Sequence, residues 1–299
     1  DKNETVFKPT EELLHKLVDV VSKGGNFLLN VGPEPSGRIR PEEAERLEAV
    51  GRWMRKYGES IYGTTASPFR LLPFFGRVTQ KDNRLYVHLF DWPADGQLVL
   101  PGLQTAPVAV ALLGRPDETV GWQFADRDGD RDVLLTLPKE PTDPIDSVVV
   151  LDFDAAPVVE PLTLRPSGDG VLDLPSAFAE IRSRHGQRAK PCSEKGRVYI
   201  GNWSNPGDVV AWSFTLPNAG TYAVAIDSRT ASKEGIGQRI EVRVGEQTLV
   251  GTIAEDGIAV EGSIAIPAGE QTLSVKLLDA KRTGPAILDL FGVTLRPAG

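Results

Sequence analysis

The fold is decided by residues 17–33, LVDVVSKGGNFLLNVGP, and by the segments on either side of them. Residues 10–21 carry apolar side chains at helical spacing behind Thr10, a candidate N-cap, and Gly24 predicts the end of this helix. The apolar run at 26–31 does not alternate with polar residues, which is typical of a strand buried on both faces of a parallel sheet. One such strand cannot form a sheet alone, so its partner strands are expected outside this chain.

A second helix is expected to begin at Pro41, because proline suits the first helical position, and to end at Gly58. The loop before it, residues 32–37, is rich in glycine and proline. The apolar stripe of this second helix consists of Leu47, Val50, Trp53, Met54 and Tyr57. The order helix, buried strand, helix is typical of α/β barrels and doubly wound sheets.

From about residue 70 the hydrophobic period changes from helical to alternating. Turn signals separate the alternating runs, and Asp128-Gly129 between two of them predicts a hairpin rather than a loop between helices. The predicted strands are residues 84–90, 97–100, 108–113, 121–125, 132–137 and 147–153. Several short strands at this spacing indicate an antiparallel β-sandwich.

A second all-β segment begins near residue 159, where alternation is clearest at Val210, Trp212 and Phe214. Its size suits a jelly roll. The predicted fold class is therefore mostly β, with two β-sandwich domains preceded by a helix–strand–helix remnant of a (β/α)8 barrel. The predicted domains are residues 1–66, 67–158 and 159–299.

The chain has 299 residues, a formal net charge of −8 and one cysteine, Cys192. An acidic chain without a basic face argues against nucleic acid or an anionic membrane surface as a partner, and a neutral glycan fits. No apolar run is long enough to span a membrane. The sequence opens abruptly at Asp1 and is expected to be the interior of a longer protein.

Residues 17–33 closely resemble a segment that the family 29 glycoside hydrolases, the α-L-fucosidases, share. The resemblance continues through Gly37-Arg38-Ile39, Gly51-Arg52-Trp53-Met54 and Gly58-Glu59-Ser60-Ile61-Tyr62-Gly63-Thr64. In that family the segment forms a helix and the eighth strand of the barrel. Residues 85–93 and 99–103 look like the small β-sandwich that follows the barrel in many bacterial members. Residues from about 171 to 295 look more loosely like the carbohydrate-binding-type jelly rolls appended to such enzymes.

The resemblance implies the C-terminal portion of a retaining exo-α-L-fucosidase, which hydrolyses terminal α-L-fucose from glycans. Its expected partners are a fucosylated glycan and the remainder of the catalytic barrel, in a secreted or periplasmic bacterial protein. In the family, the nucleophile and the acid/base carboxylates precede the matched segment. No catalytic residue is therefore assigned here, and this chain alone is not expected to hydrolyse anything. The alternatives are a non-catalytic glycan-binding β-sandwich protein and a purely structural interaction module.

Asn30 is a candidate for the pocket rim, because it follows the presumed eighth strand at the end where barrels build active sites. The favoured interpretation is simpler: Asn30 holds the next loop by hydrogen bonds. Trp203 with Asn202 is the candidate sugar-binding pair, although packing in the core is the favoured interpretation for Trp203. A calcium loop of the EF-hand type needs glycine at its sixth position and glutamate at its twelfth, and a loop that begins at Asp126 has neither there. No metal or other cofactor is therefore expected.

Overall fold

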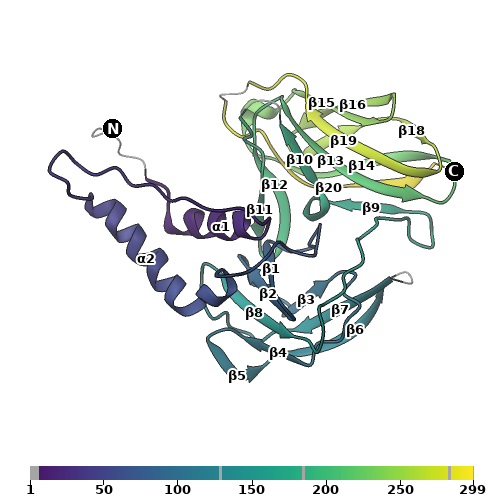
Figure 1. Ribbon diagram of the computed structural model, residues 1–299. Helices are drawn as coiled ribbons and strands as arrows, with labels where there is room; N and C mark the ends of the chain where they lie inside the picture. Colours follow the sequence, from purple (N-terminus) through teal and green to yellow (C-terminus); the bar gives the residue numbers. More distant parts are fainter. Residues whose placement is uncertain (1–6, 128–129, 184–185, 282–283, 299) are drawn as a thin grey trace. The chain divides into compact units, whose positions relative to one another are not determined.

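The computed structural model describes residues 7–127, 130–183, 186–281 and 284–298. The chain forms two compact units. Unit 1 comprises Asp1–Leu72 and Gly76–Pro161, and unit 2 comprises Pro73–Phe75 and Leu162–Gly299 (Figure 1). Strands dominate both units, which confirms the mostly β class. The prediction that residues 1–66 and 67–158 are separate domains, each folding on its own, stays a prediction.

Two α-helices open unit 1: α1 (Thr10–Val21) and α2 (Pro41–Tyr57), which the short η1 (Gly58–Ser60) follows. Pro9 and Arg40 precede them in extended conformation, and Pro41 occupies the start of α2 as predicted. Thr10 is the first helical residue rather than the N-cap, and the cap position has no side-chain hydrogen bond. Gly24 follows α1 with a φ of 75°, the left-handed conformation that ends many helices.

The predicted strand at residues 26–31 is not a strand in this structure. The segment is extended, but it pairs with no other strand of the described chain. The physical reason is that a strand needs neighbours to satisfy its backbone groups, and the helices beside it offer none. Leu28, in the middle of this apolar run, is 90% exposed.

Unit 1 continues as an antiparallel sandwich of two sheets. The five-stranded sheet contains, in spatial order, β1 (Gly76–Lys81), β2 (Arg84–Leu89), β8 (Ser147–Asp152), β4 (Ala109–Leu112) and β5 (Arg115–Thr119). The three-stranded sheet contains β3 (Gln97–Leu100), β7 (Asp130–Thr136) and β6 (Gly121–Arg127). Strands β6 and β7 pair up to Arg127 and Asp130, as the predicted hairpin requires, and its two turn residues lie outside the described residues.

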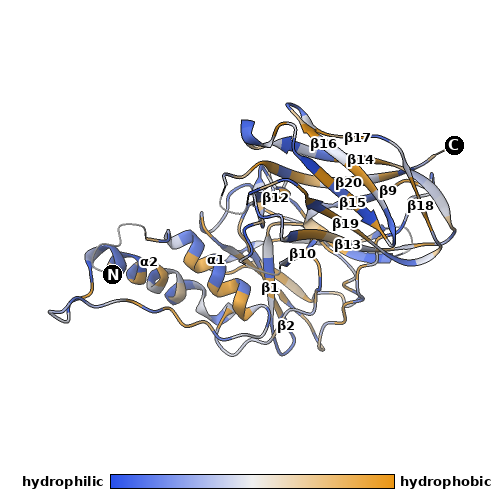
Figure 2. Cartoon of the chain, turned by 90° about the horizontal axis from the view of Figure 1, so that it is seen from above, coloured by the Kyte–Doolittle hydropathy of each residue, from blue (hydrophilic) through white to orange (hydrophobic). Residues whose placement is uncertain are grey.

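The two helices cover the outer face of the five-stranded sheet, so unit 1 has three layers. Their apolar stripes, visible as orange bands in Figure 2, pack against that sheet. The shared cluster comprises Leu14, Val18, Trp53, Tyr57, Ile61, Tyr86, Val148 and Val150. Both faces of β2 are therefore buried. Its alternating sequence alone would also be compatible with a strand that exposes one face to solvent.

Polar contacts fix the helices on the sheet. Trp53 Nε1 donates to the Asp146 carbonyl at 3.1 Å, and the Tyr57 hydroxyl donates to the Thr142 carbonyl at 3.0 Å. A third contact holds α1: Arg77 Nε on β1 donates to Asp19 Oδ1 on α1 at 2.6 Å.

The Asp19–Arg77 contact is expected to make the packing of α1 sensitive to acid. Burial raises the pKa of Asp19, but the charge of Arg77 and the hydrogen bonds of Lys23 and Arg77 outweigh it and hold the pKa below 3.8. A lowered folded-state pKa contributes stability above the unfolded value, and this contribution is lost as the pH falls through the folded value. Asp19→Asn should therefore lower the free energy of unfolding by about 1 kcal/mol at about pH 7 and by less at about pH 3.

Urea unfolding of the wild type and the variant at both pH values measures this difference. Glu12→Gln, at the exposed Lys8–Glu12 contact on the same helix, is the matched control and should show no such pH dependence. An equal loss for Asp19→Asn at both pH values would contradict the assignment.

Unit 2 is a second antiparallel sandwich, with two six-stranded sheets. One sheet contains β10 (Glu180–Ser183), β13 (Asp208–Leu216), β19 (Gly269–Leu277), β15 (Arg239–Val244), β16 (Gln247–Ala254) and β17 (Gly257–Val260). The other contains β11 (Lys190–Glu194), β12 (Arg197–Trp203), β20 (Leu288–Pro297), β14 (Gly220–Thr230) and β18 (Ser263–Ile266), with β9 (Leu172–Pro175) paired to β20. Two short 3₁₀ turns, η2 (Ser176–Phe178) and η3 (Lys233–Gly235), connect strands.

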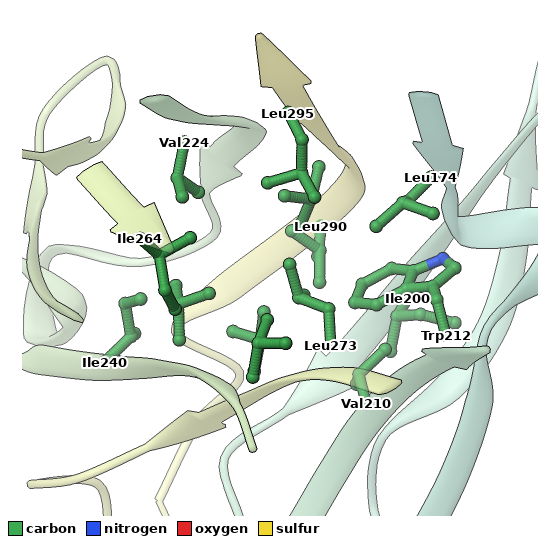
Figure 3. Packing of buried hydrophobic residues seen from close by; sticks show 14 of the residues in the cluster. Leu174, Ile200, Val210, Trp212, Val224, Ile240, Ile264, Leu273, Leu290 and Leu295 are labelled. Atoms are coloured by element: carbon green, nitrogen blue, oxygen red, sulfur yellow. The ribbon is translucent and has the colours of Figure 1, made fainter. Parts of the chain in front are cut away.

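The core of unit 2 lies between these two sheets. Figure 3 shows Trp212 and Val210 of β13 meeting Leu290 of β20 and Leu174 of β9 across the gap. The alternation noted in the sequence at Val210, Trp212 and Phe214 is thus the inward face of β13, and all three side chains are buried.

Candidate functional site

A groove in unit 1 surrounds the unpaired segment 26–31. Its walls are α1, the first turns of α2 and this segment, and its volume is about 380 Å³. Asn30 lines it, together with the apolar side chains of Phe7, Leu13, Phe27, Leu28, Leu29, Val31 and Leu47. The candidate rim residue therefore lies beside a concave surface, on an exposed stretch of chain. Whether Asn30 touches a substrate stays a prediction.

Charged side chains also line the groove. The guanidinium groups of Arg40 and Arg46 lie over the Phe7 ring, at 4.5 and 5.3 Å from its centroid. Glu43 Oε1 lies 3.8 Å from Arg40 Nη2 and accepts a 3.4 Å hydrogen bond from the Gly32 amide. Glu43 Oε2 is buried and has no hydrogen-bond partner in the described chain.

The groove supplies one carboxylate, Glu43, among its described lining residues. Retaining hydrolysis of a glycoside needs two carboxyl groups about 5–5.5 Å apart, one as nucleophile and one as acid/base. The described lining of the groove can therefore provide an apolar wall and polar contacts. It does not contain the two carboxyl groups that would break a glycosidic bond.

Trp203 is not a sugar platform, which corrects that candidate assignment. Its side chain is fully buried in the core of unit 2, so neither ring face can stack on a ligand. The physical reason is that Trp203 ends β12 on the inward face, opposite Leu288 of β20. Core packing, the favoured interpretation from the sequence, is what the structure shows.

Asn202 is exposed, and its role in the fold is clear. The β12–β20 register shifts between Ile200 and Trp203, and Asn202 there has a φ of 53°. Asparagine tolerates this left-handed conformation better than most residues. Its side-chain amide donates to the Arg188 carbonyl at 2.8 Å. Sugar binding by Asn202 stays a prediction, and the structure does not bring it together with an exposed aromatic Trp203.

The acidic run at 126–132 is partly tied into ion pairs. Asp132 is buried, accepts the Gly102 amide at 2.9 Å and pairs with Arg127 at 2.9 Å, whereas Asp128 lies outside the described residues. Across the described chain, no three His, Cys, Asp or Glu side chains gather where they would hold a metal ion. No described helix is long and apolar enough to cross a membrane.

His88 and Asp146 form a fully buried pair that the sequence did not reveal. His88 Nδ1 lies 2.8 Å from Asp146 Oδ2, and neither side chain is exposed to solvent. His88 Nε2 and Asp146 Oδ1 have no hydrogen-bond partner in the described chain. Burial raises the pKa of Asp146, against the charge and hydrogen bond of His88. Residues 84–90 alone do not indicate this pair, because the burial of His88 depends on the helices that cover β2.

Residues 1–59 match the family described as alpha-L-fucosidase. Tissue alpha-L-fucosidase of Rattus norvegicus is 36% identical over 147 residues, which are 47% of this chain and 30% of that protein. Plasma alpha-L-fucosidase of Homo sapiens is 32% identical over 139 residues, which are 43% of this chain and 28% of that protein. The amino-terminal half of this chain is thus similar in sequence to α-L-fucosidases.

The fold of both units recurs in a solved structure. The crystal structure of alpha-L-fucosidase from Vibrio sp. strain EJY3 superposes with a TM-score of 0.59 at 21% identity, covering 99% of this chain and 52% of that chain. The chain thus spans about half the length of that structure, and its match covers 30% of the rat protein.

Proposed function

We propose that this chain is the carboxyl-terminal part of a retaining exo-α-L-fucosidase, a secreted or periplasmic enzyme of a bacterium that removes terminal α-L-fucose from glycans. One observation carries the proposal: the segment that matches the fucosidase family contains an apolar, extended, unpaired run at residues 26–31. Such a run is what a barrel strand becomes when its neighbours are missing.

The exposed apolar surface supports a barrel as the missing partner. A strand in a parallel sheet is covered on both faces and hydrogen bonded on both edges. Here α1 and the first turns of α2 form a groove with residues 27–31, and this groove is lined mainly by apolar side chains. Leu28 on this run is exposed to 90%.

In this proposal the chemistry comes from outside the chain. The nucleophile and the acid/base belong to the preceding barrel units, and this chain supplies the last strand, the loop after it and two accessory sandwiches. Asn30 would then lie at the carboxyl-terminal end of a barrel strand, the end where barrel active sites form. A fucosylated glycan is the proposed substrate.

The test is expression of the complete reading frame that contains this chain. We expect the complete protein to hydrolyse 4-nitrophenyl α-L-fucoside, and proton NMR of the first product to show retained α configuration. The 299-residue chain by itself should release no nitrophenol. Hydrolysis by the short chain, or an upstream sequence without further β/α units, would rule the proposal out.

Leu28→Asp should separate a barrel strand from a surface segment. In the complete protein it would bury an unpaired carboxylate, and we expect a loss of about 3 kcal/mol or more in the free energy of unfolding, together with loss of fucosidase activity. In the 299-residue chain the same change should fall within about 0.5 kcal/mol, because the side chain is exposed.

Val158→Asp is the matched control, since Val158 is an exposed aliphatic residue in unit 1 outside the strands. It should be silent in both proteins. Equal, small effects of Leu28→Asp in both proteins would show that residues 26–31 stay exposed in the complete molecule.

A further inference from the structure

The groove in unit 1 is basic, although the chain as a whole is acidic. Lys8, Lys16, Arg40 and Arg46 line it, against one carboxylate, Glu43, in its described lining. The whole chain carries a formal net charge of −8. Cations therefore gather at the same place as the apolar side chains of the groove.

Two of these four cations have carboxylate partners. Glu12 Oε1 lies 3.5 Å from Lys8 Nζ, and Glu43 Oε1 lies 3.8 Å from Arg40 Nη2. Even when both carboxylates are counted, the groove keeps an excess of positive charge. Such an excess favours a partner surface of the opposite sign.

The other two cations, Lys16 and Arg46, form no ion pair with a carboxylate of the described chain. Arg46 donates to the carbonyl oxygens of Lys8 and Glu42, both at 2.7 Å. Lys16 on α1 is exposed, and the ion pairs beside it on this helix involve other residues. A surface that brought carboxylates to these two side chains would gain both ion pairs.

The groove also lacks hydrogen-bond partners. No backbone amide or carbonyl of residues 26–31 forms a backbone hydrogen bond in the described chain. Glu43 Oε2 is buried without a partner there. Polar groups that a covering surface buries need partners, so a cover for this groove has to supply hydrogen bonds as well as apolar contacts.

The position of the groove favours a cover from the same polypeptide. Phe7 and Lys8 line the groove, so in the proposed complete protein the preceding barrel units are joined to this chain beside it. A tethered surface has a high effective concentration at its site. A separate acidic protein would bind without this advantage.

We propose that the barrel units that precede this chain cover the groove with an amphipathic surface whose carboxylates pair with Lys16 and Arg46. This inference rests on the proposed function, because it takes the cover from the same polypeptide. It adds the chemistry of the contact: apolar side chains against Leu13 and Leu47, and acidic side chains at the two cations. A second copy of this chain is the rival occupant that the experiment has to separate.

The test is carbodiimide cross-linking of the complete protein, which joins a lysine amine directly to a carboxylate in contact with it, followed by mass spectrometry of the peptides. We expect Lys16 to be linked to an aspartate or glutamate that precedes Asp1. Lys23, which lies 2.8 Å from Asp19 Oδ2, is the positive control. Lys139, exposed in unit 1 outside the groove lining, should form no link to the preceding residues. A mixture of ¹⁴N- and ¹⁵N-labelled protein distinguishes links within one molecule from links between copies.

The rate at which Lys16 is acetylated gives a second readout. It should be lower in the complete protein than in the 299-residue chain on the order of tenfold, because a covered amine reacts only after local opening. Lys139 should react at the same rate in both proteins.

Lys16→Glu tests the charge of the cover. In the complete protein it should lower the midpoint of thermal unfolding by about 5 °C or more, because two carboxylates would then face each other under the cover. In the 299-residue chain the shift should be about 1 °C or less, since Lys16 is exposed there. Arg52→Glu, at the exposed Arg52–Glu48 pair outside the groove lining, is the matched control and should cause the same small shift in both proteins.

Three outcomes would overturn this inference: Lys16 linked only to residues 1–299 of its own or another copy, equal acetylation rates in the two proteins, or equal shifts of the midpoint for Lys16→Glu. If Lys16→Glu prevents the complete protein from folding, cross-linking and acetylation of the wild type decide. Any of the three outcomes in a protein that hydrolyses the fucoside would leave the proposed function standing. Links to preceding carboxylates in a protein without fucosidase activity would disprove the proposed function and leave the acidic cover standing.

Discussion

Asp146→Ala is expected to lower the free energy of unfolding of unit 1 by roughly 3–5 kcal/mol, the usual cost of removing one partner of a buried ionisable pair. The change leaves the fully buried His88 ring without its 2.8 Å contact to Asp146 Oδ2. Since His88 Nε2 already has no partner in the described chain, both ring nitrogens would then lack one. No water can reach the ring, because the helical layer covers it.

Urea unfolding followed by hydrogen exchange in β2 and β8 measures this effect. The double variant His88→Leu with Asp146→Val should recover most of the loss, because two apolar groups need no partners. Glu118→Ala, at the exposed Arg115–Glu118 pair on β5, is the control and should fall within about 0.5 kcal/mol. A loss for Asp146→Ala no larger than that of the control would contradict a structural role for the pair.

Trp212→Ala should destabilise unit 2 by about 3–5 kcal/mol, because a large side chain leaves a cavity that the two sheets cannot close. Trp212 is 1% exposed, and its Nε1 donates to the Pro175 carbonyl at 2.8 Å. The same variant should leave the hydrogen exchange of unit 1 unchanged, because the core of unit 2 is a separate cluster.

A pair of phenylalanine variants separates packing from hydrogen bonding at the two buried tryptophans. Trp212→Phe should cost about 1 kcal/mol more than Trp203→Phe, because only the former breaks an indole hydrogen bond and leaves the Pro175 carbonyl unpaired. Trp203 Nε1 is buried with no partner in the described chain, so its removal loses no such bond. Calorimetry of the two variants checks this order, and equal costs would show that packing alone decides.

Much of the fold was visible in the sequence because its signals are local. The predicted strand at 97–100 is β3 to the residue, and those at 84–90 and 147–153 differ from β2 and β8 by one residue at the end. The start of α2 at Pro41 is also as predicted. Alternation, turns and proline placement act over a few residues, so a single sequence carries them.

The errors concern partners that are distant in the sequence. Residues 26–31 have the composition of a buried strand, but a strand also needs neighbours to pair with, and no strand of the described chain pairs with this segment. The burial of His88 is another example, because nothing in residues 84–90 shows that Trp53 of α2 lies near this side chain, with 6.2 Å between the ring centroids.

The three-layer arrangement of unit 1 limits how such a gene can be recombined. A crossover near residue 66 would transfer the first sandwich without α1 and α2, and the face that carries Tyr86, Val148 and Val150 would meet water. The Asp146 carbonyl would lose the Trp53 indole at the same time. A crossover between residues 161 and 162 would cut neither core. Lineages that gain or lose the second sandwich should therefore be common, and free-standing copies of the first sandwich without its two helices should be rare.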